Sequence, residues 1–264
     1  MSIDLAIHGA AGRMGQRVVA CAAADNGFEI VTAFESVDHP QLEADAGLLA
    51  GIAGLGVPLK PVGPTAAAIV IDFSVPDAAM AMIEHCLAEK KPVVIATTGF
   101  SDAQIAAIHE AAKAIPVVFA PSMSPAVNLV MKLTEIAGGA LKDLPSGVDV
   151  EIIERHHRFK EDAPSGTALK FGEIVAKAMD KPAVAHGREG RPGQRPSNEI
   201  GYHAVRTGDN PGEHTIVFGM LGETIELNVA ASNRDCYAQG ALMAAKWLID
   251  KPPGLYGMAE VLGL

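Results

Sequence analysis

Short apolar runs alternate with helical patterns over the first half of the chain. The runs at 3–8, 28–35, 67–74, 92–99 and 115–122 predict strands, and helical spacing at 13–24, 76–89 and 101–113 predicts helices between them. The run AAIVIDFS (67–74) is almost wholly apolar, which is typical of a strand covered on both faces. This alternation predicts an α/β fold with a doubly wound, Rossmann-like parallel sheet. Residues 38–67 lack clear periodicity and are expected to be irregular.

The pattern changes after about residue 125. A helical segment (126–141) leads to the β-rich VDVEIIERHHR (148–158), a second helix (168–178) and a polar loop (186–199). Three strand-like runs follow at 202–207, 213–220 and 223–231, and we expect them to be antiparallel neighbours joined by the GDNPG and LG turns. The last helix (235–250) resembles those of the first half. The sequence therefore predicts one domain from 1–125 plus 235–264, and a second, α+β domain from 126–234.

Charge and cysteine content narrow the classes of partner and compartment. The 264 residues carry a formal charge of −10, which argues against nucleic acid as a partner. Cys21, Cys86 and Cys236 are odd in number and widely spaced, which indicates buried thiols in a reducing compartment. Asp4 lies where a signal peptide would be positive, and the stretch AGLLAGIAGLGVPL is broken by four glycines. We therefore expect a cytoplasmic protein without a membrane partner.

The loop GAAGRMG (9–15) follows a strand and opens a helix. Glycines there allow a tight turn and close approach of a pyrophosphate to the helix N-terminus. The spacing is GxxGxxG and not GxGxxG, so a tight turn without a ligand is the alternative. Glu35 ends the second strand, about 20 residues after the loop, where an acid binds the adenosine ribose hydroxyls. The combination predicts a nicotinamide dinucleotide cofactor, NADH or NADPH.

Two further features concern the choice of cofactor and the nicotinamide pocket. No Lys or Arg lies between Phe34 and Asp38, so we expect NADH to be used at least as well as NADPH, although Arg13 could reach a 2′-phosphate. The carboxyl ends of the strands carry ATTGFS (96–101) and APSMS (120–124). Thr97, Thr98 and the backbone at 122–123 are candidates for the nicotinamide pocket. Ordinary turn chemistry is the alternative for them.

The stretch HHRFKEDAPSGTA (156–168) carries the chemistry of the second half. A metal site is disfavoured because adjacent histidines diverge on a strand and no second ligand cluster is present. A nucleophilic Ser165 is disfavoured because GxSxG flanks and a paired base are missing. A solvated basic loop remains an alternative. However, Ser165, Gly166 and Thr167 precede a helix, and Lys160 adds charge, which together favour an anion site. A histidine there can donate a proton at neutral pH.

The other histidines are scattered singly and are expected in packing or surface positions; they are His8, His39, His85, His109, His186, His203 and His214.

The chain resembles the 4-hydroxy-tetrahydrodipicolinate reductase (dihydrodipicolinate reductase) family. The matching motifs, in order over nearly the whole chain, are GAAGRMG, DFS, ATTGF, EIIERHHRFKEDAPSGTA, REG (188–190), IGYHAVRTGDNPGEHTIVF and SNR. The resemblance implies a Rossmann-like dinucleotide domain, a substrate and oligomerisation domain used in homotetramer assembly, and hinge closure between them. It also implies NAD(P)H-dependent reduction of the dehydrated form of 4-hydroxy-tetrahydrodipicolinate, a small dicarboxylate, in lysine (diaminopimelate) biosynthesis.

The resemblance assigns roles by position. His156 is the implied proton donor and Lys160 the second catalytic group. Substrate contacts fall on His157, Ser165, Gly166 and Thr167. The dinucleotide contacts fall on Gly9, Ala10, Ala11, Gly12, Arg13, Met14, Glu35, Ala96, Thr97, Thr98, Ala120, Pro121, Ser122 and Met123. Met123 stands where the family commonly has an aromatic residue, and Ser36 replaces a basic residue of some members.

Two other functions compete with this reading. One is a different two-domain dehydrogenase, such as an aspartate or homoserine dehydrogenase. The other is a regulator that binds NAD(H) without chemistry, which would need a helix-turn-helix or a basic face that this acidic chain does not show.

Overall fold

The computed structural model describes residues 2–264 and divides the chain into two compact units. Unit 1 comprises the chain up to Pro125 together with Arg234–Leu264, and unit 2 comprises Ala126–Asn233. The sequence placed the second boundary between residues 234 and 235, one residue further along. Each unit has its own sheet and its own apolar core, and each is described by itself below.

Unit 1 is built on a seven-stranded parallel sheet. Its strands are β1 (Ile3–His8), β2 (Phe28–Phe34), β3 (Leu59–Lys60), β4 (Ile69–Asp72), β5 (Val93–Ile95), β6 (Pro116–Phe119) and β12 (Gly254–Tyr256). They lie in the order β12-β6-β5-β4-β1-β2-β3, and every pair is parallel. The predicted doubly wound sheet is therefore confirmed. The strand order reverses between β1 and β4, where folds of this class bind ligands at the carboxyl ends.

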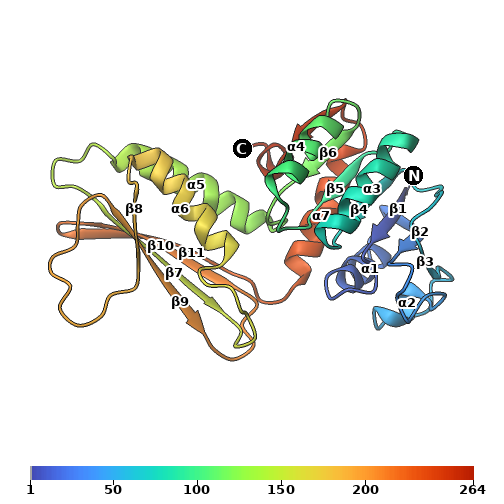
Figure 1. Cartoon of the computed structure of the whole chain (residues 1–264), viewed down its shortest axis with the longest axis horizontal. Helices are drawn as coiled ribbons and strands as arrows, with labels where there is room; N and C mark the ends of the chain where they lie inside the picture. Colours follow the sequence, from blue (N-terminus) through green and yellow to red (C-terminus); the bar gives the residue numbers. More distant parts are fainter. Residues whose placement is uncertain (1) are drawn as a thin grey trace. The chain divides into compact units, whose positions relative to one another are not determined.

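Helices cover both faces of this sheet (Figure 1). Val18 and Val19 of α1 (Gly15–Ala23) and Ala241 of α7 (Asp235–Leu248) pack on one face with Leu5 and Ile7. The opposite face buries side chains of α3 (Pro76–Glu89) and α4 (Asp102–Ala111). Burial on both sides explains why the strands read as continuous apolar runs.

Part of unit 1 differs from the sequence prediction. The segment 38–67 was expected to be irregular, yet it contains α2 (Ala46–Leu49) and β3. The Asp45 carboxylate organises this segment, because it accepts hydrogen bonds from the amides of Leu48, Leu55, Gly56 and Val57. Such a hub leaves no periodic signal. The short elements β12 and α8 (Met258–Leu262) were likewise not predicted.

Unit 2 is a mixed sheet with two helices on one face (Figure 1). The helices are α5 (Pro125–Leu141) and α6 (Gly166–Met179). The strands are β7 (Asp149–His156), β8 (Ala183–His186), β9 (Glu199–Arg206), β10 (Glu213–Met220) and β11 (Glu223–Ala230), in the order β11-β10-β7-β9-β8. The core beneath the helices includes Ile152, Phe171 and Phe218.

The predicted neighbourhood of the last three strands is partly wrong. β10 and β11 form the expected antiparallel pair, but β9 does not lie beside β10. Instead β7 separates them, and it is parallel to β9 and antiparallel to β10. The GDNPG loop crosses the end of β7, where the amides of His157 and Arg158 donate to the carbonyls of Asn210 and Gly208 at 2.8 and 3.1 Å. Because the prediction paired strands that are adjacent in sequence, it could not place β7 between β9 and β10.

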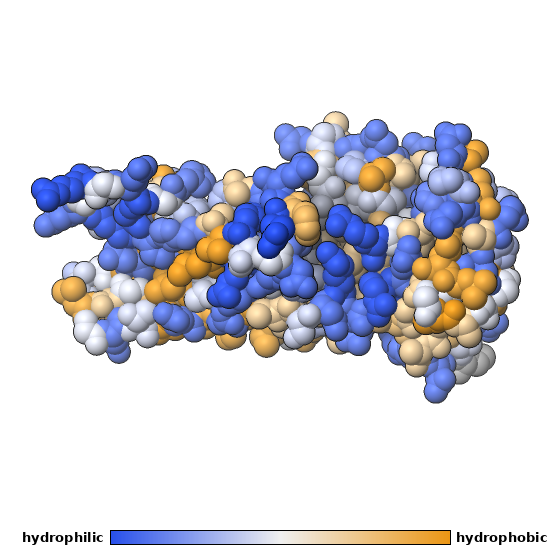
Figure 2. All heavy atoms as spheres, turned by 90° about the horizontal axis from the view of Figure 1, so that it is seen from below, coloured by the Kyte–Doolittle hydropathy of each residue, from blue (hydrophilic) through white to orange (hydrophobic). Residues whose placement is uncertain are grey.

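The face of the unit 2 sheet opposite the helices is not covered by another element of the unit. Ile153 and Val205 on it are 41% and 42% exposed. Figure 2, a view from below, shows apolar side chains gathered over this part of the chain between polar ones. We call this surface the open face.

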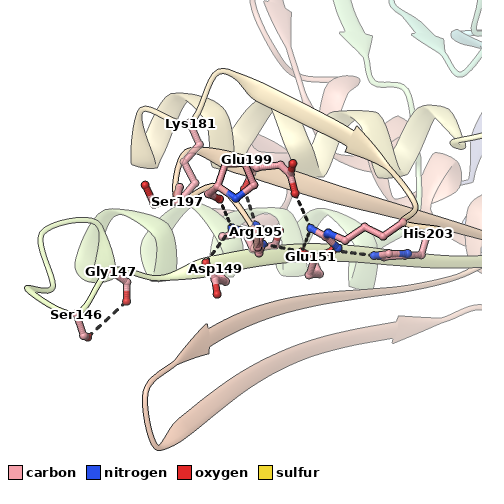
Figure 3. Close-up of polar contacts among 12 residues, drawn as sticks. Ser146, Gly147, Asp149, Glu151, Lys181, Arg195, Ser197, Glu199 and His203 are labelled. Carbon is pink, nitrogen blue, oxygen red and sulfur yellow. Dashed lines mark hydrogen bonds and ion pairs between the residues drawn. The ribbon is translucent and has the colours of Figure 1, made fainter. Parts of the chain in front are cut away.

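A charged network lies on the open face at Glu151 (Figure 3). The guanidinium groups of Arg188 and Arg195 and the imidazole of His203 each lie within 2.8 Å of the Glu151 carboxylate. Burial would raise the pKa of Glu151, but these hydrogen bonds outweigh it and hold the pKa at about 2. A Cβ at Gly201 would lie 1.9 Å from this carboxylate, so any larger residue there would displace it. The network fastens the polar loop 187–198 to the sheet.

No helix among residues 2–264 combines the length and the apolar character that crossing a membrane requires.

Candidate active site

The glycine loop of unit 1 forms a tight turn at the start of α1. Gly9 has φ +73°, and its amide and that of Ala10 donate to the carbonyl of Phe34. A Cβ at Gly15 would lie 2.0 Å from the Gly9 carbonyl oxygen, so the loop can close only with glycine there. No side chain caps the first turn of α1, and no acidic residue lies in it. These amides are therefore suited to an anionic ligand, and the loop fits a pyrophosphate.

The Glu35 carboxylate faces the glycine loop. One oxygen accepts from the amide of Ala11 and the other from the amide of Ser36, both at 3.0 Å. Lys60, which the sequence analysis did not consider, pairs with Phe34 across β2 and β3, and its ammonium lies 5.5 Å from the Phe34 ring centroid. Its Nζ donates to the carbonyl of Pro64.

A buried polar cluster lies at the carboxyl ends of β1, β4 and β5. Asp72, only 1% exposed, contacts His8 Nδ1, Ser74 Oγ and Thr97 Oγ1, each at 2.6 Å. His8 is buried, as one of the two predicted alternatives has it, but its ring is also paired with a carboxylate at the carboxyl end of the sheet. The cluster fixes the Thr97 hydroxyl, whereas Thr98 is exposed.

Residues 120–123, which follow β6, are mostly buried, whereas side chains in direct contact with a cofactor would be accessible. Ala120 and Met123 are 3% and 1% exposed, and Met123 packs in the core. A Cβ at Gly240 of α7 would lie 1.7 Å from the Met123 carbonyl. Pro121 is exposed, while Ser122 is buried and hydrogen-bonded. Any contact from Met123 would therefore come from its backbone.

In unit 2, the stretch 154–168 forms a compact polar cluster. The Glu154 carboxylate accepts from His156 Nδ1 at 2.6 Å, from both terminal nitrogens of Arg206 at 2.7 Å, and from the amide of Ser165 at 3.1 Å. Lys160 Nζ pairs with Asp162 at 2.7 Å. The amide of Lys160 donates to the carbonyl of His157 at 3.1 Å, so the chain turns back beside the end of β7 that carries His156.

Ser165 begins α6 as its N-cap. Its hydroxyl accepts from the amide of Ala168 at 3.1 Å and lies 2.9 Å from His214 Nε2. His214 of β10 is a partner of Ser165 that the sequence did not reveal. Ser165 is only 2% exposed, so the pair is a buried support for the helix start. Gly166 is exposed and Thr167 half-buried at the same helix end.

Burial shapes the protonation of this cluster. Burial, together with the nearby His156, lowers the pKa of His214 to about 4, so His214 is neutral at pH 7. The pKa of His156 is also lowered by burial, and hydrogen bonding to Glu154 opposes this. For Glu154, burial would raise the pKa, but hydrogen bonds from Arg206 and His156 lower it below its ordinary value.

Two donor-type nitrogens near the cluster are buried without a partner in the described part of the chain, namely His157 Nδ1 and Arg206 Nε. Unpaired buried polar atoms carry a free-energy cost unless a ligand or water satisfies them. Over residues 2–264, no group of three or more His, Cys, Asp or Glu side chains has an arrangement that could hold a metal ion.

Comparison with known proteins gives the family. The profile described as dihydrodipicolinate reductase, N-terminus, matches residues 3–123, and the profile described as its C-terminus matches residues 126–262. The chain belongs to the dihydrodipicolinate reductase family. The 4-hydroxy-tetrahydrodipicolinate reductase of Rhodopirellula baltica is 59% identical and is aligned over 99% of this chain and 96% of its own. That of Thiobacillus denitrificans is 46% identical over the full length of both.

Solved structures agree with this family membership. The dipicolinate-bound dihydrodipicolinate reductase from Paenisporosarcina sp. TG-14 matches with a TM-score of 0.77 and 25% identity, over 98% of this chain and 99% of that one. An amine dehydrogenase from Mycobacterium smegmatis, with 13% identity and a TM-score of 0.66, covers 97% of this chain and 94% of its own and shares the fold alone. The resemblance found from the sequence motifs is therefore confirmed at the level of family and fold.

The structure places five residues in the two clusters to which the sequence prediction gave no role: His8, Asp72, Glu154, Arg206 and His214. A signal existed for Glu154, because it follows Val150 and Ile152 at alternate positions of β7 and so falls on the buried face. Arg206 and His214 come from β9 and β10, whose register with β7 the sequence does not reveal.

Proposed function

We propose that this chain reduces the dehydrated form of 4-hydroxy-tetrahydrodipicolinate to tetrahydrodipicolinate, in the cytoplasmic synthesis of diaminopimelate and lysine. The observation that carries the proposal is the family's His-His…Lys…Ser-Gly-Thr stretch folded into one cluster at the start of α6, in a chain matched to named reductases over its whole length. Three free cysteines are compatible with a reducing compartment. Of these only Cys86 is fully buried, since Cys21 and Cys236 are half-buried.

Unit 1 would hold the dinucleotide. The amides of the glycine loop and of the first turn of α1 would bind the pyrophosphate, and Glu35 would bind the adenosine ribose. The strand-end segments at Ala96–Thr98 and Ala120–Met123 would line the nicotinamide side. The reduced dinucleotide supplies a hydride when bound.

Unit 2 would hold the dicarboxylate. The Lys160 ammonium, His157, and the exposed N-terminus of α6 at Gly166 and Thr167 are suited to two carboxylates. The buried Ser165 would act through the helix start that it caps. His156 would supply the proton that, with the hydride, completes addition across the carbon–carbon double bond. Fixing the ring in this way contributes to the rate by orientation.

A coupled assay tests the activity and the choice of cofactor together. With dihydrodipicolinate synthase supplying the substrate, we expect oxidation of NADH with kcat/KM at least equal to that for NADPH. The reason is that the Glu35 carboxylate, which we propose to bind the adenosine ribose, would repel a phosphate on that ribose. Glu35→Ser should shift the ratio toward NADPH. A large preference of the wild-type protein for NADPH would contradict the cofactor assignment. Turnover of aspartate or homoserine without any of this activity would contradict the function.

We propose further that the protein is a homotetramer assembled through the open face. Ile153 and Val205 are exposed apolar residues there, flanked by the Glu151 network (Figure 3). Light scattering should give four times the chain mass of 27.4 kDa. Replacing Ile153 and Val205 together by lysine should reduce the mass, because paired sheets would then bury charge without partners. An unchanged tetramer in that variant would exclude this face.

A further inference from the structure

Glu154 is the most completely enclosed carboxylate of the cluster in unit 2. Only 1% of it is exposed. Along the buried face of β7 it follows the apolar residues Val150 and Ile152 and precedes His156. Burying an ionised carboxylate costs several kcal/mol unless hydrogen bonds and an opposite charge compensate. Arg206 gives that compensation through both terminal nitrogens, so the carboxylate stays ionised.

The contacts of Glu154 divide between its two oxygens in a way that links two parts of the cluster. Oε2 accepts from His156 Nδ1 at 2.6 Å, and Oε1 accepts from the amide of Ser165 at 3.1 Å. Arg206 bonds to both oxygens and also donates to the carbonyl of Asp162. One carboxylate therefore fixes the ring of His156 and the residue that starts α6.

The contact to Nδ1 has a chemical consequence. An ionised carboxylate accepts only, so the proton of neutral His156 must reside on Nδ1, which leaves Nε2 as the nitrogen that exchanges a proton with a ligand. A negative charge at hydrogen-bond distance also favours the protonated ring. A carboxylate that orients a histidine in this way is a recurrent device in proton transfer.

We infer that Glu154 is a positioning residue for the reduction. It holds His156 with Nδ1–H toward the carboxylate and Nε2 toward the dicarboxylate, and it raises the protonated fraction of the ring, while it also anchors the carboxylate-binding helix start. This inference rests on the proposed function, which makes His156 the proton donor.

Other charged groups also face His156, and they bear on its titration. From the loop after β7 come Lys160 and its partner Asp162, from β9 comes Arg206, and from β10 comes the neutral His214, whose ring centroid lies 5.2 Å away. From α6 the cluster receives Ser165 and Phe171, which carry no charge. Lys160 and Arg206 oppose protonation of His156, so Glu154 is the group in contact that favours it.

The test is the pH profile of Glu154→Gln with Glu151→Gln as a matched control. Both changes remove a carboxylate that binds arginine on the same strand, but Glu151 lies on the open face, three residues before Glu154 (Figure 3). In the wild type, kcat falls as pH rises through the pKa of His156. In Glu154→Gln this fall should move about 1–2 pH units lower, with about a 10–100-fold loss of kcat near pH 7.5 that is recovered at lower pH. In Glu151→Gln the fall should stay in place.

A loss in Glu154→Gln that is equal at every pH, or a matching shift in Glu151→Gln, would overturn the inference. Glu154→Asp keeps the charge, and its profile should lie closer to the wild type than that of the glutamine variant.

A second measurement needs no variant and no activity. A neutron crystal structure of the ligand-free wild-type protein at pH 8 should show deuterium on His156 Nδ1 and none on Nε2. Deuterium on Nε2 alone would refute the assignment even if the protein is the proposed reductase. Absence of reductase turnover with the Nδ1 tautomer present would instead refute the proposed function and leave the orientation by Glu154 standing.

Discussion

Lys160→Ala and His156→Ala should each lower kcat by about 10²–10⁴-fold, while the Kd for NADH stays nearly unchanged. His156 is 8% exposed and is held by Glu154, and Lys160 adds a positive charge beside it. Removing His156 removes the group proposed to deliver the proton, and removing Lys160 removes a full charge facing the dicarboxylate. The proposed dinucleotide contacts are all residues of unit 1, whereas both substituted residues belong to unit 2. Steady-state kinetics and NADH fluorescence titration measure the two quantities.

Lys170→Ala is the matched control for Lys160→Ala. Lys170 belongs to the same unit and also pairs with a carboxylate, Glu173 at 2.9 Å, but on the solvent side of α6. Its removal should leave kcat within about twofold, because exposed ion pairs contribute little. Loss of NADH binding in both alanine variants, with kcat at saturation intact, would show that His156 and Lys160 do not have the proposed roles.

Acid should destabilise unit 2 through His214 well before its carboxylates titrate. His214 is 4% exposed, and burial lowers its pKa to about 4 from an ordinary value of 6.5. The unfolded chain therefore binds a proton on this residue at a pH where the folded chain does not. Stability from this group is complete above pH 6.5 and is lost as pH falls to about 4, at a total cost of about 3 kcal/mol. Denaturant midpoints between pH 7 and 4.5 measure this loss.

His214→Gln separates this effect from other acid-sensitive groups. Glutamine can still form a hydrogen bond with Ser165 Oγ but does not titrate, so the decline between pH 6.5 and 4.5 should be much smaller. Glu151, with a pKa of about 2, stays ionised in the folded protein over this range. If the variant and the wild type lose stability in parallel, His214 is not the group responsible.

The features that could be predicted are those determined by residues close together in the sequence. The alternation of apolar runs and helices fixed the parallel sheet of unit 1, because burial on both faces leaves a run that any window can detect. The N-cap at Ser165 was predictable for the same reason, since helix starts depend on neighbours in sequence.

The residues that the sequence did not identify make contacts with partners that are far away along the chain. β7 lies between β9 and β10, so Arg206 and His214 reach Glu154 and Ser165 from strands about 50 residues away in sequence. His8 and Asp72 meet across 64 residues in the same manner. Single histidines were assigned to packing or the surface because their partners could not be seen, and the partners decide their chemistry.

Strand β7 presents different chemistry on each of its sides, with Glu151 outward and Glu154 and His156 inward. The interval between these residues is consequently as important as their identity. An added or deleted residue within it would turn His156 toward solvent and bring Arg155 among the apolar side chains. Natural or engineered changes of chain length should therefore be tolerated in the polar loop 187–198 and be lethal to the enzyme within 151–156.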